Sequence, residues 1–129
     1  MSGSVISWQS RKQRMVSLSS TEAEYVALSE ASREAIYLRN LMYEITGKLC
    51  IITLHCDNQS ALKLAASQQS HNRSKHIDVR YHYVRDAIKN KLIQVKYIST
   101  QEMPADLLTK GLLSAKHYKF MRMIGVIPN

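Results

Sequence analysis

The first long segment of the chain carries apolar residues at helical spacing. Ser19–Thr21 offers N-caps, and Glu22 and Glu24 each lie three residues after one of these candidate caps. Gly47 is a suitable C-terminal stop. One long amphipathic helix is therefore predicted, with its apolar stripe at these positions: Ala27, Ala31, Ala35, Leu38, Leu41, Met42 and Ile45.

Three segments have the pattern of β-strands. Ser4–Ser10 alternates and contains β-branched residues, which predicts a strand, and a short extended piece is predicted at Met15–Leu18. Leu49–Cys56 is a nearly continuous apolar run, as expected for a strand covered on both faces. Leu92–Ser99 alternates again and predicts another strand.

Shorter helices are predicted between and after these strands. Ser60–Ala66 and His76–Lys91 have helical patterns, separated by a polar, basic loop at Ser67–Lys75. Pro104 suits the first turn of a helix over Ala105–Leu113, and another helix is compatible with the tail after Ser114. Strands that alternate with helices in this order predict an α/β fold with parallel crossovers, in which helices pack on the sheet.

Length and composition fit one globular domain, residues 1–129. The hydrophobic fraction of 45% and the charged fraction of 22% are ordinary. No apolar run approaches a membrane span, and the polar N-terminus does not resemble a signal peptide, so no membrane partner is expected. Cys50 and Cys56 suggest no disulfide framework, which favours a reducing compartment, cytoplasmic or nuclear.

The charge balance predicts a polyanionic partner. The formal net charge is +8 and the isoelectric point is near 9.7. A basic surplus attracts nucleic acid because each phosphate contact releases counterions, although a solvated basic surface is the simpler alternative. The basic residues occur in four groups: Arg11-Lys12-Arg14, Arg73-Lys75-Arg80, Lys89-Lys91 and Lys116-Lys119-Arg122.

Three acidic residues stand out by their positions in the predicted elements. Glu22 opens the long helix, Asp57 follows the apolar strand, and Asp106 opens the last helix. Ligand sites of α/β sheets lie outside the carboxyl ends of the strands, where three carboxylates can converge on a hard cation. Each residue also has a structural alternative: Glu22 and Asp106 favour helix N-termini, Glu22 can form a capping box with Ser19, and Asp57 suits a turn.

Taken together, the motifs around these residues resemble a known family. SSTEAEYVALSEA, CDNQSA, SKHIDVRYHYVRDAI and ADLLTK occur in this order and spacing. They look like the ribonuclease H domain of copia-type LTR retrotransposon Pol polyproteins, and SWQSRKQRMVSLSS fits the same pattern. The resemblance extends from Ser4 to Lys110, and residues 114–129 correspond to a less constrained tail.

The resemblance implies a ribonuclease H-like fold and a two-metal hydrolase that cuts the RNA strand of an RNA–DNA hybrid. Such enzymes use two Mg²⁺ or Mn²⁺ ions roughly 4 Å apart. Four carboxylates hold the ions in the family, and Glu22, Asp57 and Asp106 match the second, third and fourth. Glu22 and Asp57 would then hold one ion, and Asp106 would help to hold the other.

Some of these assignments have rivals. Glu24 competes with Glu22, although the Thr-Glu pair of the motif favours Glu22. His76, Asp78 and His82 have a spacing that zinc ligands also show. The family carries Lys-His-Ile-Asp there without a known zinc role, and a helix start or a contact with substrate is preferred. Contacts with nucleic acid are expected from Arg11, Lys12, Arg14, Asn58, Gln59, Arg73, Lys75, His76 and Arg80.

The chain departs from the family at its beginning. It opens at what corresponds to the third strand, and it contains no Asp before Asp57 that can replace the family's first, metal-bridging Asp. The chain alone is therefore expected to be weak or inactive. Ser4–Ser10, an upstream Pol fragment or a homodimer is expected to cover the sheet edge. The alternative function is a domesticated, non-catalytic module that binds nucleic acid or protein.

Overall fold

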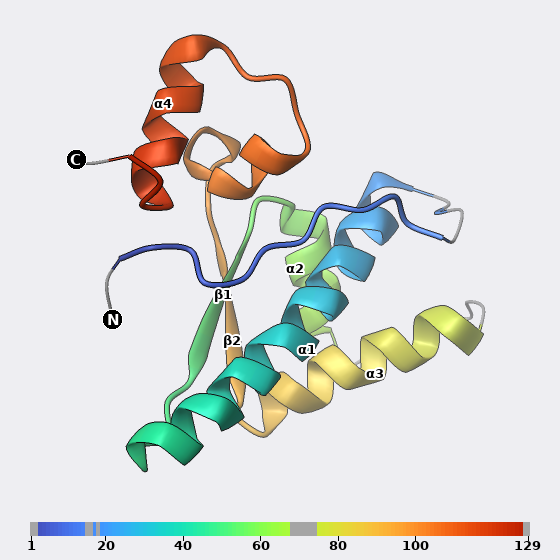
Figure 1. Ribbon diagram of the computed structural model, residues 1–129. Helices are drawn as coiled ribbons and strands as arrows, with labels where there is room; N and C mark the ends of the chain where they lie inside the picture. Colours follow the sequence, from blue (N-terminus) through green and yellow to red (C-terminus); the bar gives the residue numbers. More distant parts are fainter. Residues whose placement is uncertain (1–2, 15–16, 18, 68–74, 128–129) are drawn as a thin grey trace. The chain divides into compact units, whose positions relative to one another are not determined.

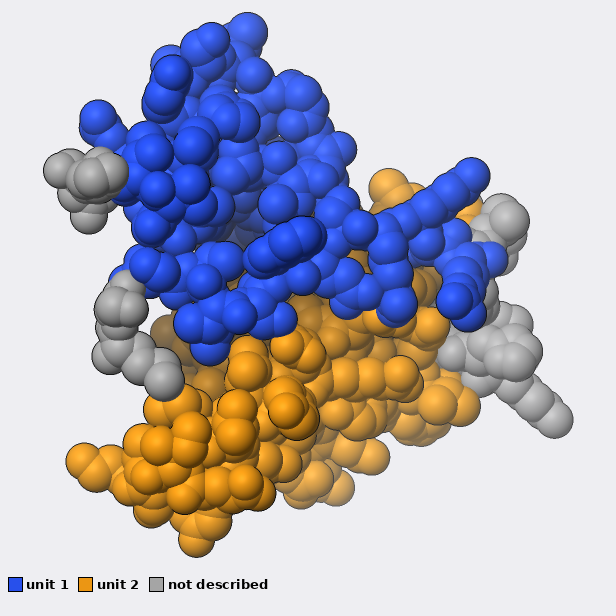
Figure 2. Space-filling view, viewed as in Figure 1, with its two compact units in different colours: residues 1–14, 98–129 blue, residues 15–97 orange. Residues whose placement is uncertain are grey.

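The computed structural model describes residues 3–14, 17, 19–67 and 75–127, and only the backbone of residues 75–78. The described residues form two compact units, unit 1 (residues 1–14 and 98–129) and unit 2 (residues 15–97) (Figure 2). The elements, in chain order, are α1 (Ser20–Thr46), β1 (Ile52–Cys56), α2 (Gln59–Ala66), α3 (Lys75–Lys89), β2 (Ile93–Tyr97), η1 (Thr100–Glu102), η2 (Pro104–Leu108) and α4 (Ser114–Met123) (Figure 1).

The long helix α1 confirms the prediction from helical spacing and caps. The Ser19 hydroxyl accepts a hydrogen bond from the backbone N–H of Glu22 at 3.2 Å, and Gly47 ends the helix with a left-handed φ of 67°. Its buried face differs from the predicted stripe, because Ala27 and Ala31 are exposed. The residues turned inward are Glu22, Tyr25, Val26, Leu28, Ser29, Ser32 and Ala35.

The sheet of the described chain consists of β1 and β2, which run parallel. Ile52 pairs with Ile93 and Leu54 with Val95, and these residues pack against the core clusters of unit 2. Leu49 and Ile51 are 64% and 50% exposed, so the prediction of one strand over Leu49–Cys56, covered on both faces, is wrong.

The opposite face of this sheet is polar. Thr53 pairs with Gln94, whose side-chain amide donates to the Thr53 hydroxyl at 2.7 Å, and His55 pairs with Lys96. His55 and Lys96 are both exposed. The apolar run therefore contains polar positions with the period of two that a sheet covered on one face requires.

The core of unit 2 lies where three helices meet the sheet. Figure 1 shows α1, α2 and α3 around the two strands. Ala61 and Ala65 of α2 are buried, and their small side chains allow the larger core residues to approach α2 closely. The larger buried residues of the two adjoining clusters are Tyr25, Leu28, Cys56, Tyr81, Val84 and Ile93.

Unit 1 contains the two other departures from the predicted elements. Ser4–Ser10 is not a strand: Val5 N–H donates to the carbonyl of Ile124 at 2.9 Å, and the Ser10 hydroxyl donates to the carbonyl of Leu108 at 2.9 Å. These bonds attach the segment to irregular backbone, and a strand forms only beside another strand. Pro104–Leu108 is a 3-10 helix, not the start of the predicted α-helix over Ala105–Leu113.

The C-terminal helix α4 shows that the tail contains regular structure. Phe120 is fully buried in the chain, and the helix ends at Met123 before Gly125, which has a left-handed φ of 74°. A Cβ atom at Gly125 would lie 2.7 Å from the carbonyl oxygen of Gly3. Glycine is therefore required there by both conformation and space. None of the described helices is long and apolar enough to cross a membrane.

The cap of α2 provides a first testable prediction. The Asn58 side-chain oxygen accepts a hydrogen bond from the backbone N–H of Ala61 at 3.0 Å. Replacing Asn58 by Ala should lower the free energy of unfolding by about 1 kcal/mol, because an N-cap bond is lost. Urea denaturation measures the change, and Gln59→Ala is the matched control at the next, exposed position. Equal stability of the two variants would contradict the capping role.

Candidate functional site

Glu22 lies in the first turn of α1 and is almost completely buried, with 3% of its surface exposed. Its backbone N–H is held by Ser19, so the cap fixes the start of the helix and the position of the carboxylate. A negative charge is favourable at this place because of the helix dipole. Burial of a carboxylate is nevertheless costly, which makes Glu22 an unusual residue for a purely structural role.

Asp57 directly follows β1 and is partly buried. Burial raises the pKa of the adjacent Cys56 thiol, the hydrogen bond to the Asn58 backbone lowers it, and the carboxylates of Glu24 and Asp57 raise it. Both carboxylates therefore act on the same atom. A negative potential at the end of β1 favours a cation there.

The N-terminal end of α1 and the carboxyl end of β1 lie at the same end of unit 2 (Figure 1). Tyr25, one turn after Glu22, belongs to the same buried cluster as Cys56, the residue before Asp57. The fold thus brings the neighbourhoods of Glu22 and Asp57 together, at the edge of the parallel sheet where ligands of α/β proteins bind.

A pair of stacked tyrosines fixes this end of α1 on α3. The rings of Tyr25 and Tyr81 have centroids 4.0 Å apart, and the Tyr25 hydroxyl donates to the carbonyl of Tyr81 at 3.5 Å. Burial raises the pKa of Tyr25, with the charge of Arg85 acting in the opposite direction. The tyrosine therefore stays neutral at physiological pH and serves as a packing residue.

Asp106 lies in the first turn of η2 and is 6% exposed. Its Oδ1 atom forms an ion pair with Lys110 at 2.8 Å, and its buried Oδ2 atom has no hydrogen-bond partner among the described residues. A buried carboxylate oxygen without a partner is costly, and a hard cation prefers such an oxygen as a ligand. Asp106 therefore fits the role of a metal ligand.

The three carboxylates belong to different units, Glu22 and Asp57 to unit 2 and Asp106 to unit 1. Their convergence on one point stays a prediction. Within the described part of either unit, no three His, Cys, Asp or Glu side chains are grouped as ligands of a metal ion.

The residues predicted to contact nucleic acid are distributed over both units. Arg11, Lys12 and Arg14 are exposed in unit 1. Asn58 caps α2, and Gln59 is exposed at the start of that helix. Both lie beside Asp57.

The second basic group, Arg73-Lys75-Arg80, is only partly described. Arg80 forms an ion pair with Glu30 at 3.0 Å and so connects α3 to α1. Arg73 lies outside the described residues, and Lys75 and His76 are described only as backbone at the start of α3.

The sequence interpretation missed the two charged partners of these residues. Lys110 lies four residues after Asp106, and this spacing was available in the ADLLTK motif as a signal for an ion pair. The pairing of Glu30 with Arg80 joins residues 50 positions apart, and no local pattern indicates it.

Comparison with known proteins identifies the relatives of the chain. It is 41% identical over 128 residues, 99% of its length, to the retrovirus-related Pol polyprotein from transposon TNT 1-94 of Nicotiana tabacum. It is 39% and 38% identical over 95% and 94% of its length to the Pol polyproteins from transposons RE2 and RE1 of Arabidopsis thaliana. No protein-family profile matches the sequence, and no solved structure matches it.

These relatives confirm part of the resemblance. The homologues over nearly the whole chain are copia-type retrotransposon Pol polyproteins. The chain spans about a tenth of the length of these polyproteins, which are 10%, 8% and 8% covered.

Proposed function

We propose that the chain is the C-terminal part of a ribonuclease H-like domain of a copia-type Pol polyprotein. The activity of the complete domain is hydrolysis of the RNA strand of an RNA–DNA hybrid. The observation that supports this proposal most directly is that the start of α1, whose first turn carries Glu22, lies at the same end of unit 2 as the carboxyl end of β1, which Asp57 follows. The similarity to Pol polyproteins over nearly the whole chain makes a nucleic acid the natural substrate.

In this proposal the three carboxylates are ligands of Mg²⁺ or Mn²⁺. Glu22 and Asp57 hold one ion, and Asp106 contributes to the other through its buried Oδ2 atom. Divalent ions supply a more acidic water and charge stabilisation at the phosphate. The protein holds the ligands in position: Ser19 caps the helix that carries Glu22, and Lys110 orients Asp106.

The substrate is proposed to bind by its phosphates. The net charge of +8 favours a polyanion. The exposed side chains available for phosphate contacts include Gln59, Arg11, Lys12 and Arg14. Asn58 already accepts a backbone hydrogen bond in capping α2, so its amide N–H₂ group is the part that is suited to a phosphate or sugar oxygen.

Metal binding by the carboxylates tests the proposal. Mn²⁺ titration should show binding to the parent chain that weakens about tenfold or more in Asp57→Asn, because a charged oxygen ligand becomes neutral. Glu22→Gln should have a similar effect. Glu44→Gln is the matched control, since Glu44 is exposed near the far end of the same helix, and it should bind Mn²⁺ like the parent. Glu24→Gln should weaken binding less than Glu22→Gln does, because Glu24 contributes charge but is not proposed as a ligand. If Glu24→Gln lost Mn²⁺ binding and Glu22→Gln kept it, the ligand would be Glu24, and the assignment to Glu22 would be wrong.

A further inference from the structure

Unit 1 carries more than half of the net positive charge of the chain in well under half of its length. It contains seven Lys and Arg residues but only two acidic residues, Glu102 and Asp106. Glu102 forms an ion pair with Lys119, and Asp106 forms one with Lys110. Both acidic residues are thus neutralised within the unit, and the basic surplus remains to attract an anion.

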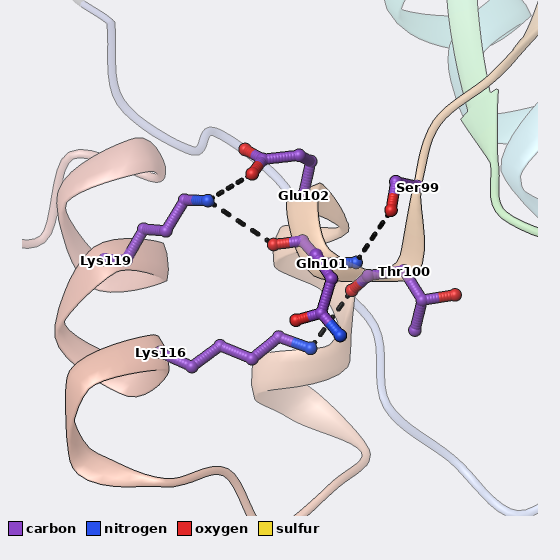
Figure 3. A network of polar contacts seen from close by, with 6 residues as sticks. All are labelled: Ser99, Thr100, Gln101, Glu102, Lys116 and Lys119. Carbon is purple, nitrogen blue, oxygen red and sulfur yellow. Dashed lines mark hydrogen bonds and ion pairs between the residues drawn. The ribbon is translucent and has the colours of Figure 1, made fainter.

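The orientation of α4 separates two faces of this helix. Lys116 donates to the carbonyl of Thr100 at 3.1 Å, and Lys119 contacts Glu102, so both lysines point toward η1 (Figure 3). Phe120 is buried. The remaining face carries an aromatic and a cationic side chain one turn apart.

These two side chains are Tyr118 and Arg122. Tyr118 is 60% exposed, and Arg122 is also exposed. Residues four apart lie side by side on a helix surface. A flat ring beside a guanidinium group is a suitable pair for a nucleotide, with the base on the ring and the phosphate on the cation.

The N-terminal segment of unit 1 presents a second such arrangement. Its backbone is bonded to Ile124 through Val5 and to Leu108 through the Ser10 hydroxyl, at 2.9 Å in both cases. Trp8 lies between these two attachment points and is 70% exposed. A large indole is normally buried or placed at an interface.

Charged residues follow Trp8 within a few positions. Arg11, Lys12 and Arg14 are all exposed. A partner protein with an apolar surface would not account for these positive charges, and a second copy of this basic chain would be repelled by them. A single strand of nucleic acid accounts for both the exposed indole and the cations, because it combines planar bases that are not already stacked in a duplex with phosphates.

We propose that unit 1 binds single-stranded nucleic acid, with bases stacked on Trp8 and Tyr118 and phosphates bound by Arg11, Lys12 and Arg122. This goes beyond the proposed function, because the binding needs no metal ion and none of the three carboxylates. It gives the chain a site for an unpaired strand that shares Arg11 and Lys12 with the contacts proposed for the hybrid and adds Trp8, Tyr118 and Arg122.

The tryptophan itself is the reporter for the test. The chain contains one Trp, so fluorescence excited selectively in tryptophan, and not in the seven tyrosines, comes from Trp8. The full chain is titrated, in EDTA, with a thymidine oligonucleotide of about 12 nucleotides. Stacking should quench the fluorescence, and inorganic polyphosphate, which has the charge without bases, should cause little quenching at equal phosphate concentration.

Variants separate stacking from charge. Affinity, measured by anisotropy of a labelled oligonucleotide, should fall about tenfold in Trp8→Ala and in Tyr118→Ala, and less in Trp8→Phe, which keeps a ring. Arg11→Ala should reduce the slope of log affinity against log salt by about one. Lys48→Ala, an exposed cation of unit 2, is the control and should bind like the parent.

Several results would overturn the proposal. They are unchanged fluorescence with the oligonucleotide, equal affinity of Trp8→Ala and the parent, or tighter binding to anionic lipid vesicles than to the oligonucleotide. Sedimentation that shows a dimer dissociated by Trp8→Ala would also overturn it, since a second copy would then be the occupant. Asp57→Asn should keep full affinity, so failure of the metal-site proposal is distinguishable from failure of this one.

Discussion

The polypeptide of these 129 residues should cleave an RNA–DNA hybrid orders of magnitude more slowly than a complete two-metal nuclease. Two divalent ions about 4 Å apart repel each other, and a carboxylate that bridges them offsets this repulsion and fixes their separation. Glu22, Asp57 and Asp106 supply three negative charges, and the chain contains no Asp before Asp57. Ligand positions in such sites must be good to a fraction of an ångström, so the missing bridge should strongly reduce the rate.

The measurement compares the chain alone with the chain joined to a preceding segment. The segment is taken from the tobacco TNT 1-94 Pol polyprotein, immediately before the part that matches. With a labelled hybrid and Mg²⁺ or Mn²⁺, the joined protein should cleave much faster, and Asp57→Asn in the joined protein should abolish the gain. Non-specific nuclease contamination would survive this substitution, which makes the variant the control.

Two other outcomes have clear meanings. Robust Mg²⁺-dependent cleavage by the chain alone, lost in Asp57→Asn, would contradict the prediction and would mean that an acidic residue of a second chain completes the site. Hybrid binding without cleavage in either protein would favour a non-catalytic module over the proposed nuclease. Gel filtration of the active species distinguishes one chain from two.

Helices α1, α2 and α3 were predictable because their signals are local, whereas the α-helix predicted over Ala105–Leu113 begins as the 3-10 helix η2. The Ser19 cap, the spacing after it and Gly47 defined α1 to within a residue at its start. The same local information did not identify its buried face. Ala27 and Ala31 are exposed while Ser29 and Ser32 are fully buried, since α2, α3 and the sheet select which side of the helix is covered.

Strands were less predictable because a strand needs a partner. Ser4–Ser10 has a strand-like sequence but is bonded to Ile124 and Leu108, and no other strand accompanies it in the described chain. Leu49–Cys56 begins pairing only at Ile52, where β2 lies beside it. In both cases the tertiary environment, not the residue pattern, decided the result.

The candidate site combines both kinds of information. The motif selected Glu22 over Glu24, and burial supports that choice, because Glu22 is 3% exposed whereas Glu24 is exposed. The local sequence also placed Asp106 at a helix start. Only the three-dimensional structure revealed that one of its oxygens is bound by Lys110 and the other is buried.

Replacing Tyr25 by Ala should lower the free energy of unfolding by about 3–5 kcal/mol, the usual effect of removing a large buried aromatic side chain. Tyr25 is 1% exposed and stacks on Tyr81, and its cluster extends to Cys56 at the end of β1. The cavity would therefore open between α1, α3 and the sheet. Thermal or urea denaturation of the full chain measures the loss.

Two matched variants make the result specific. Tyr25→Phe removes only the hydroxyl, whose bond to the Tyr81 carbonyl is long at 3.5 Å, and should cost about 1 kcal/mol or less. Tyr37→Ala, at a position 63% exposed on the same helix, should change stability by no more than about 0.5 kcal/mol. If Tyr25→Phe lowered the free energy of unfolding as much as Tyr25→Ala, the hydroxyl and not the ring would be the group that stabilises the packing of α1 on α3.

The same variants test whether core packing positions the carboxylate. Because Tyr25 lies one turn after Glu22, the folded fraction of Tyr25→Ala should also bind Mn²⁺ more weakly than Tyr25→Phe does. Equal Mn²⁺ binding by the two folded variants would show that the packing of Tyr25 does not affect the position of Glu22.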